Sequence, residues 1–139
     1  MPDVPVFLDT GYLVALLNRR DSLHAQARSL ARTWEKSGRR ALTTDAVLIE
    51  LANFFARSPM RMLAISSIRQ MRASPNIVVE PLTTTLVDRG ETRYAAHADK
   101  GWSLTDCLSM EVMLDKNASE AATADRHFEQ AGFVALMKR

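Results

Sequence analysis

The sequence contains a single cysteine and no long apolar run. One cysteine excludes an intrachain disulfide and is compatible with a reducing compartment. Because Cys107 lies on a helical apolar pattern, we predict that it is a small buried hydrophobic residue. No run approaches the ~18 apolar residues of a membrane span, and the N-terminus lacks the pattern of a signal peptide. These absences predict a cytoplasmic protein that has no membrane partner.

Several catalytic motifs are absent as well. The sequence has no glycine-rich phosphate loop, no Gly-x-Ser-x-Gly elbow and no His/Cys cluster with zinc spacing. Asp9-Thr10-Gly11 lacks a second aspartate two residues later, which argues against an aspartyl-phosphate phosphatase. His24, His97 and His127 are scattered, and we predict surface or helix-packing positions for them rather than a general base. Packing is also predicted for Trp102 and Tyr94, although both could stack on bases.

The length of 139 residues points to one domain, residues 1–139. A chain of this size buries roughly 70% of its unfolded surface, so it forms a core without disulfides or structural metals. The net charge of +2 says little about partners, but 14 of the 18 positive residues are arginine. Arginine suits phosphate recognition better than lysine does. A compositional bias of the genome is the alternative explanation.

Short β-prone runs alternate with helical patterns, and no hairpin turn signal joins two strands. This alternation predicts an α/β/α three-layer fold with a central, mainly parallel sheet of four or five strands. The expected strands are 4–8, 40–43, 76–80, 120–123 and 133–137. The expected helices are 12–17, a segment capped by Ser22 and closed by Gly38, 45–57, 59–73, 84–98, 103–116 and 126–131.

Individual residues add detail to this outline. Pro59 is predicted at the first position of its helix, and Asn117 is predicted to take a left-handed conformation after the helix that ends near residue 116. Gly132 is expected to end the last helix. Leu63 is expected on the apolar side of the 59–73 helix, and Tyr94 is expected to point inward from the 84–98 helix.

Four acids occupy positions that have little structural reason to be acidic. Asp9 and Asp125 directly follow predicted strands, at the edge where open parallel sheets bind ligands. Glu50 lies on a strongly apolar helix face, and a buried carboxylate needs a partner. Asp106 lies in the first turn of a helix, three residues after Ser103.

Three of these acids also have a purely structural explanation. For Asp9, a structural role in a strand-end turn or as the N-cap of the next helix explains the residue as well as a ligand role does. Glu50 would lie at a rim, with its carboxylate in solvent. Asp106 would complete a capping box with Ser103. At this level the structural explanation and the ligand explanation both remain open for these three acids.

Converging carboxylates need a cation. Two unit charges ~4 Å apart cost about 4 kcal/mol at an effective dielectric constant of about 20, so some of the acids would stay protonated unless a cation neutralises them. Oxygen ligands select hard ions such as Mg²⁺ or Mn²⁺ over zinc. A carboxylate-held Mg²⁺ that keeps several waters is suited to phosphodiester hydrolysis.

The same segments, in the same order over essentially the whole chain, resemble a known family. They are Phe7-Leu8-Asp9-Thr10, the apolar helix with Glu50, Trp102-Ser103-Leu104-Thr105-Asp106-Cys107-Leu108-Ser109, and Thr123-Ala124-Asp125-Arg126-His127-Phe128. The set resembles the PIN-domain ribonucleases, and most of all the VapC-type toxins of toxin–antitoxin pairs. The Ser-Leu-Thr-Asp and Thr-x-Asp-x-x-Phe segments are the more specific part of the resemblance.

By analogy, the resemblance implies a Mg²⁺- or Mn²⁺-dependent endoribonuclease. Four acids match the acidic positions of the family, and two hydroxyls match positions that support the site: Asp9, Glu50, Asp106 and Asp125, with Thr10 and Thr123. Gly11 departs from the family pattern, where a small polar residue is common, and is expected to loosen the first strand–helix turn. Family members usually form homodimers and are silenced by an antitoxin, so both partners are expected here.

We therefore predict cleavage of RNA phosphodiester bonds by a water that a bound metal activates. Asp9, Asp106 and Asp125 would hold the ion or its waters, Glu50 would be a further ligand or orient the attacking water, and Arg126 would bind RNA phosphates. One alternative is a catalytically inactive PIN-fold module that binds RNA or protein. Another is a small-molecule metal phosphoesterase, which the lack of a second-site histidine cluster disfavours.

Overall fold

The computed structural model describes residues 4–139. Strands and helices alternate along this part of the chain as the sequence predicts. The strands are β1 (Val6–Leu8), β2 (Ala41–Thr44), β3 (Ile77–Glu80), β4 (Glu120–Ala122) and β5 (Val134–Ala135). The helices are α1 (Thr10–Leu17), α2 (His24–Ser37), α3 (Asp45–Phe54), α4 (Arg61–Ala73), α5 (Thr84–Ala96), α6 (Leu104–Asp115) and α7 (Arg126–Gln130).

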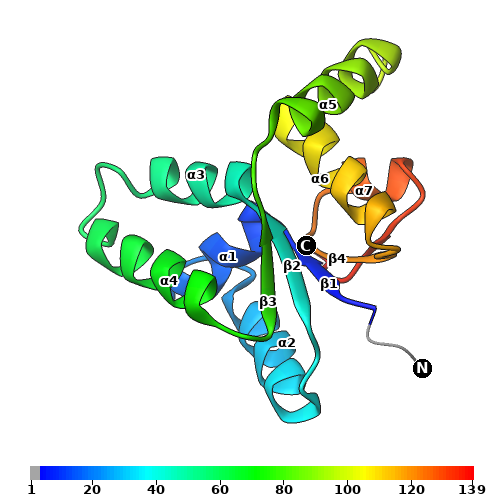
Figure 1. Cartoon of the computed structure of the whole chain (residues 1–139). Coiled ribbons are helices and arrows are strands. Elements are labelled where there is room, and N and C mark those ends of the chain that lie inside the picture. The colour runs from blue at the N-terminus through cyan, green and yellow to red at the C-terminus, as the bar shows by residue number, and fades with distance from the viewer. Residues whose placement is uncertain (1–3) are drawn as a thin grey trace.

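The five strands form one parallel sheet in the order β3-β2-β1-β4-β5. The crossovers β1–β2–β3 run in one direction across the sheet, and β3–β4–β5 run in the other. Because such crossovers are right-handed, helices α1 to α4 cover one face and α5 to α7 cover the other, as Figure 1 shows. The predicted α/β/α architecture is confirmed.

The reversal of direction falls between β1 and β4. At such a switch point the loops leave neighbouring strands toward opposite faces, and a crevice opens at the carboxyl ends of those strands. Leu8 pairs with Ala122 in the register of the two strands. The next residue along each strand is Asp9 on one side and Thr123 on the other, so the register brings these two side chains to the crevice.

Buried side chains pack against the strands that form this crevice. Phe7 of β1 and Phe128 of α7 are both fully buried, with ring centroids 6.3 Å apart. Cys107 is buried as predicted, in a small cluster with Trp102 and Met110. No helix within residues 4–139 is long and apolar enough to cross a membrane.

Local turn signals are largely confirmed. Gly38, Asn117 and Gly132 all take positive φ angles, of 69°, 57° and 94°, where their helices end. Glycine adopts this region without strain, and asparagine tolerates it better than most residues do. Most of the predicted helix boundaries lie within two residues of the observed ones.

Two predicted helix starts are wrong. Helix α2 begins at His24, and the Asp21 carboxylate, rather than the Ser22 hydroxyl, accepts the Leu23 N–H at 2.9 Å. Pro59 lies before α4, because the Ser58 hydroxyl accepts the Met60 N–H at 3.0 Å and forms a turn there. The preceding helix correspondingly ends at residue 54 rather than at residue 57.

Two residues predicted to face inward are exposed. Leu63 is 47% exposed and Tyr94 is 53% exposed. Helix α5 projects beyond the sheet and is covered mainly by α6 (Figure 1). Tyr94 lies on the side of α5 that α6 does not cover, so periodicity alone overstated its burial. The predicted packing role of Tyr94 is therefore wrong, whereas that of Trp102, 6% exposed, is confirmed.

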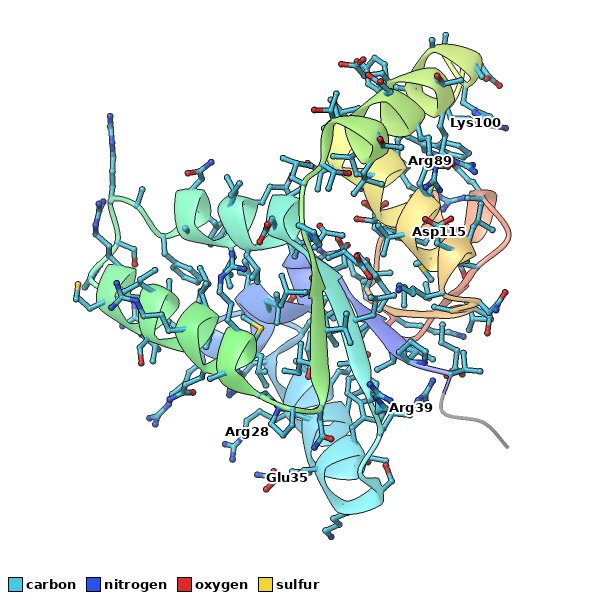
Figure 2. The ribbon with its side chains drawn as sticks, viewed as in Figure 1. Arg28, Glu35, Arg39, Arg89, Lys100 and Asp115 are labelled. Carbon is cyan, nitrogen blue, oxygen red and sulfur yellow. The ribbon has the colours of Figure 1, made fainter. Side chains whose placement is uncertain are left out.

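Helices α5 and α6 pack closely because Gly90 has no side chain. A Cβ atom at Gly90 would lie 2.6 Å from Leu108 Cδ2 and 3.1 Å from its Cγ. Arg89 binds Asp115 at 2.8 Å and Glu111 at 3.0 Å across the same contact, and Figure 2 shows Arg89 and Asp115 on the adjacent helices.

Gly90→Ala is expected to lower the free energy of unfolding by about 1–3 kcal/mol, because Leu108 must leave its preferred packing. Gly11→Ala is the matched control. Its Cβ would meet nothing within 4 Å, so better helix propensity should raise stability by up to about 1 kcal/mol. Urea denaturation measures both variants. A Gly90→Ala protein as stable as the wild type would show that the α5–α6 contact is looser than described.

Candidate active site

Asp9 lies at the centre of the crevice. Its side chain is only 8% exposed, and Oδ2 accepts a hydrogen bond from the buried Thr123 hydroxyl at 2.8 Å. Asp9 occupies the N-cap position of α1, but its side chain makes no capping hydrogen bond of the kind that Thr44 and Ser103 make at the starts of α3 and α6. The Asp9 carboxylate therefore does not cap α1 in this way.

Burial raises the pKa of Asp9 to about 7. The negative charges of Asp106 and Asp125 add to this rise, whereas hydrogen bonds from Thr123 and the backbone of Thr10 act against it. A desolvated carboxyl beside two other acids is unfavourable when ionised. A cation in the crevice would relieve this cost, so the electrostatics of Asp9 fit a metal ligand.

Asp106 has the capping role that the sequence left open, and its carboxylate also lines the crevice. Ser103 caps α6, and the Asp106 carboxylate completes the capping box by accepting the Ser103 N–H through Oδ2 at 3.1 Å. The same Oδ2 contacts His127 Nδ1 at 2.9 Å. Within residues 4–139 the other oxygen, Oδ1, has no hydrogen-bond partner, so Asp106 retains an oxygen for a ligand.

Asp125 is the N-cap residue of α7, and it contacts His127 as Asp106 does. Its Oδ1 accepts the His127 N–H at 2.9 Å and lies 3.3 Å from the imidazole Nδ1. The Asp125 N–H donates to the Thr123 hydroxyl at 3.0 Å, so Thr123 connects Asp125 to Asp9. Ligand atoms of Asp106, Asp125 and His127 all lie within 4.8 Å of one another.

Glu50 approaches the crevice from α3. Its carboxylate is half-buried and accepts a hydrogen bond from the Thr10 hydroxyl at 2.6 Å. Asp9 and Glu50 lie outside the tight group of Asp106, Asp125 and His127 but line the same cleft. Thr10 and Thr123 thus each donate a side-chain hydrogen bond to one of the predicted acids.

The cleft that these residues line has a volume of about 820 Å³. All seven residues singled out from the sequence line it: Asp9, Thr10, Glu50, Asp106, Thr123, Asp125 and Arg126. Arg126 is exposed at the rim, and Arg139 also lines the cleft. One wall is therefore acidic and partly buried, whereas basic groups lie at the solvent side.

Sequence reasoning missed His127. A surface or helix-packing position was predicted, and the side chain is 32% exposed, but the sequence did not reveal that its imidazole contacts the carboxylates of Asp106 and Asp125. The available signal was its place two residues after Asp125 in the first turn of a helix. The other two histidines do pack as predicted: His24 Nδ1 contacts the Ala15 carbonyl at 2.7 Å, and His97 stacks on Trp102 with centroids 4.6 Å apart.

Residues 6–134 match the PIN domain family model, so the chain belongs to the PIN-domain family. The chain is 29% identical over 129 residues to the 23S rRNA-specific endonuclease VapC20 of Mycobacterium tuberculosis, from strains CDC 1551 / Oshkosh and ATCC 25618 / H37Rv. The match covers 93% of this chain and 95% of that protein.

A comparison with solved structures also finds VapC20. The crystal structure of Mycobacterium tuberculosis VapC20, described as a sarcin-ricin loop cleaving toxin, superposes with a TM-score of 0.81 at 28% identity. It covers 93% of this chain and 96% of that one. The predicted resemblance to VapC-type PIN ribonucleases is confirmed, and the comparisons favour a nuclease over the inactive binding module.

Proposed function

We propose that this chain is an endoribonuclease that depends on Mg²⁺ or Mn²⁺ and hydrolyses RNA phosphodiester bonds. The main support is the convergence of Asp9, Asp106 and Asp125 at the switch point of the sheet, with Asp9 desolvated beside the other two. Carboxylate oxygens suit a hard divalent ion. Such an ion, when bound, supplies an activated water and offsets the charge that develops on the phosphate.

The residues of the chain have distinct proposed roles. Asp9, Asp106 and Asp125 hold the ion or its waters. Glu50, positioned by Thr10, is a further ligand or orients the attacking water. Thr123 keeps Asp9 and Asp125 in register through its two hydrogen bonds.

His127 and Arg126 extend this set. His127 lies between Asp106 and Asp125 and fixes the separation of their carboxylates. Arg126 binds RNA phosphate at the rim of the cleft.

The relatives support the proposed substrate and partners. VapC20 is described as acting on 23S rRNA and the sarcin-ricin loop, so a ribosomal RNA stem–loop is the first substrate to test. We propose that the physiological role is that of a toxin in the cytoplasm, silenced by a cognate antitoxin. We also propose a homodimer, and exposed apolar side chains on α3 and α4, among them Phe54 and Met62, offer surface for protein partners.

The test is to incubate the purified protein with mixed RNAs and with a ribosomal stem–loop, in Mg²⁺, in Mn²⁺ and in chelator. We expect products with either metal and none with chelator, because the acids cannot stabilise a second anion without a cation. Equal cleavage in chelator would contradict the metal dependence. No cleavage under any condition would favour the inactive binding module.

A further inference from the structure

The last residues of the chain run directly toward the acidic cleft. Leu136 N–H donates to the Ala121 carbonyl and Met137 N–H donates to the Thr123 carbonyl, both at 3.0 Å. The Met137 side chain is 2% exposed. The backbone is therefore fixed up to residue 137, next to the threonine whose hydroxyl binds Asp9.

The side chain of Gln26 fixes the following residue. Its Oε1 accepts the Lys138 N–H at 3.0 Å, and its Nε2 donates to the Lys138 carbonyl at 2.5 Å. One amide side chain thus binds both backbone groups of Lys138, which constrains the direction in which the chain continues. Helix α2 in this way holds a segment that lies 112 residues away along the chain.

These contacts to residues 136–138 place Arg139, the next residue, at the cleft. It is exposed and lines the same cleft as Asp9, Asp125 and Arg126. Among residues 4–139, neither Arg139 nor Arg126 forms an ion pair with a carboxylate. Their guanidinium groups are therefore available to an anion, and arginine binds phosphate through two parallel N–H donors.

The charge pattern explains why a second arginine matters here. The four acids of the cleft repel RNA phosphates, and a cation would offset this only near the reacting bond. Phosphates on either side of that bond need separate positive groups. Arg126 at the start of α7 and Arg139 at the end of the Gln26-bound segment both supply one at the cleft rim.

We propose that Arg139 binds a backbone phosphate of RNA in the cleft and that Gln26 is the residue that positions it. This inference rests on the proposed function, because it takes RNA as the occupant of the cleft. Arg139 contributes affinity without reading base sequence, as phosphate contacts do.

The test measures RNA binding separately from cleavage. Fluorescence anisotropy follows a labelled, mixed-sequence single-stranded RNA in chelator, at a series of salt concentrations. Arg139→Gln is expected to weaken binding about fivefold at low salt and to lower the slope of log affinity against log salt by about 0.7, the value for one lost contact on a single strand. Arg139→Lys should keep the slope of the wild type.

Further variants distinguish the positioning of Arg139 by Gln26 from a general loss of positive charge. Gln26→Leu should weaken binding in the same direction, and the Gln26→Leu/Arg139→Gln pair should be no weaker than Arg139→Gln alone, since both act on one contact. Arg28→Gln is the matched control. Arg28 is on the same helix but outside the cleft, in the lower part of the view in Figure 2. Affinity and slope should therefore not change beyond a small general charge effect.

An Arg139→Gln protein with the affinity and slope of the wild type would overturn the inference, as would a wild type that does not bind the RNA at low salt. If the Gln26→Leu/Arg139→Gln protein binds RNA more weakly than Arg139→Gln does, the proposed role of Gln26 is overturned. Cleavage in Mg²⁺ is scored separately. If RNA binding depends on Arg139 but no RNA is cleaved, only the proposed function is refuted. If RNA is cleaved but its binding does not depend on Arg139, only this inference is refuted.

Discussion

Asp9→Asn is expected to lower RNA cleavage by about 10²–10³-fold, the cost of removing one charge-stabilising group from a preorganised site. Asparagine keeps the volume of aspartate, and its side-chain carbonyl can still accept the hydrogen bond from Thr123, so circular dichroism should show an intact fold. The loss arises because Asp9 is the most buried of the four acids and lies where β1 meets β4. Initial rates on one RNA substrate in Mg²⁺ measure the effect.

Asp99→Asn is the control for this substitution. Asp99 carries the same carboxyl, but its side chain is 76% exposed and lies 3.7 Å from Lys100, outside the cleft. Its replacement should leave the rate within about twofold of the wild type, the size expected of a surface change. If Asp9→Asn cleaves as fast as Asp99→Asn, the buried acid is not part of the catalytic machinery.

The same substitution is expected to stabilise the protein when metal is absent. Folding raises the pKa of Asp9 to about 7 from 3.8. Between these two values the folded protein holds a proton that the unfolded chain has released. The free energy of unfolding therefore falls as pH rises from about 4 to about 7, by up to about 4 kcal/mol. Above pH 7 the whole loss is present.

The asparagine that replaces Asp9 cannot ionise, so the variant lacks this loss. We expect Asp9→Asn to be more stable than the wild type at about pH 8 in chelator, by up to about 4 kcal/mol, and the difference to shrink toward about pH 4. Urea denaturation of both proteins across this range reports the ionisation of Asp9 together with its coupling to Asp106 and Asp125, because the more distant titrating groups are common to the pair. A difference that does not change with pH would show that Asp9 is not desolvated in the folded protein.

The placement of two acids at the cleft could be predicted from the sequence, because it depends only on neighbouring residues. A carboxyl that directly follows a buried parallel strand must lie at the carboxyl edge of the sheet, and this applied to Asp9 and Asp125. The Ser103–Asp106 spacing likewise predicted a capping box that the structure contains. These inferences needed only neighbouring residues and the direction of a strand.

Features that depend on tertiary contacts were not predictable in this way. Nothing near His127 in the sequence shows that Asp106, 21 residues earlier, contacts its ring. The link between Gln26 and Lys138 joins residues whose patterns are independent. Tyr94 fits an apolar helix face, but only the position of α6 decides which part of that face is covered.

The proposed activity depends on a divalent ion bound by acids that meet only in the folded chain. Calorimetric titration of Mn²⁺ into the wild type, Asp9→Asn and Asp99→Asn at about pH 8 tests this directly, because Asp9 is then ionised. We expect the wild type and Asp99→Asn to bind Mn²⁺ alike, and Asp9→Asn to bind at least about tenfold more weakly. Equal Mn²⁺ affinity in all three proteins, or no binding to the wild type, would contradict the account.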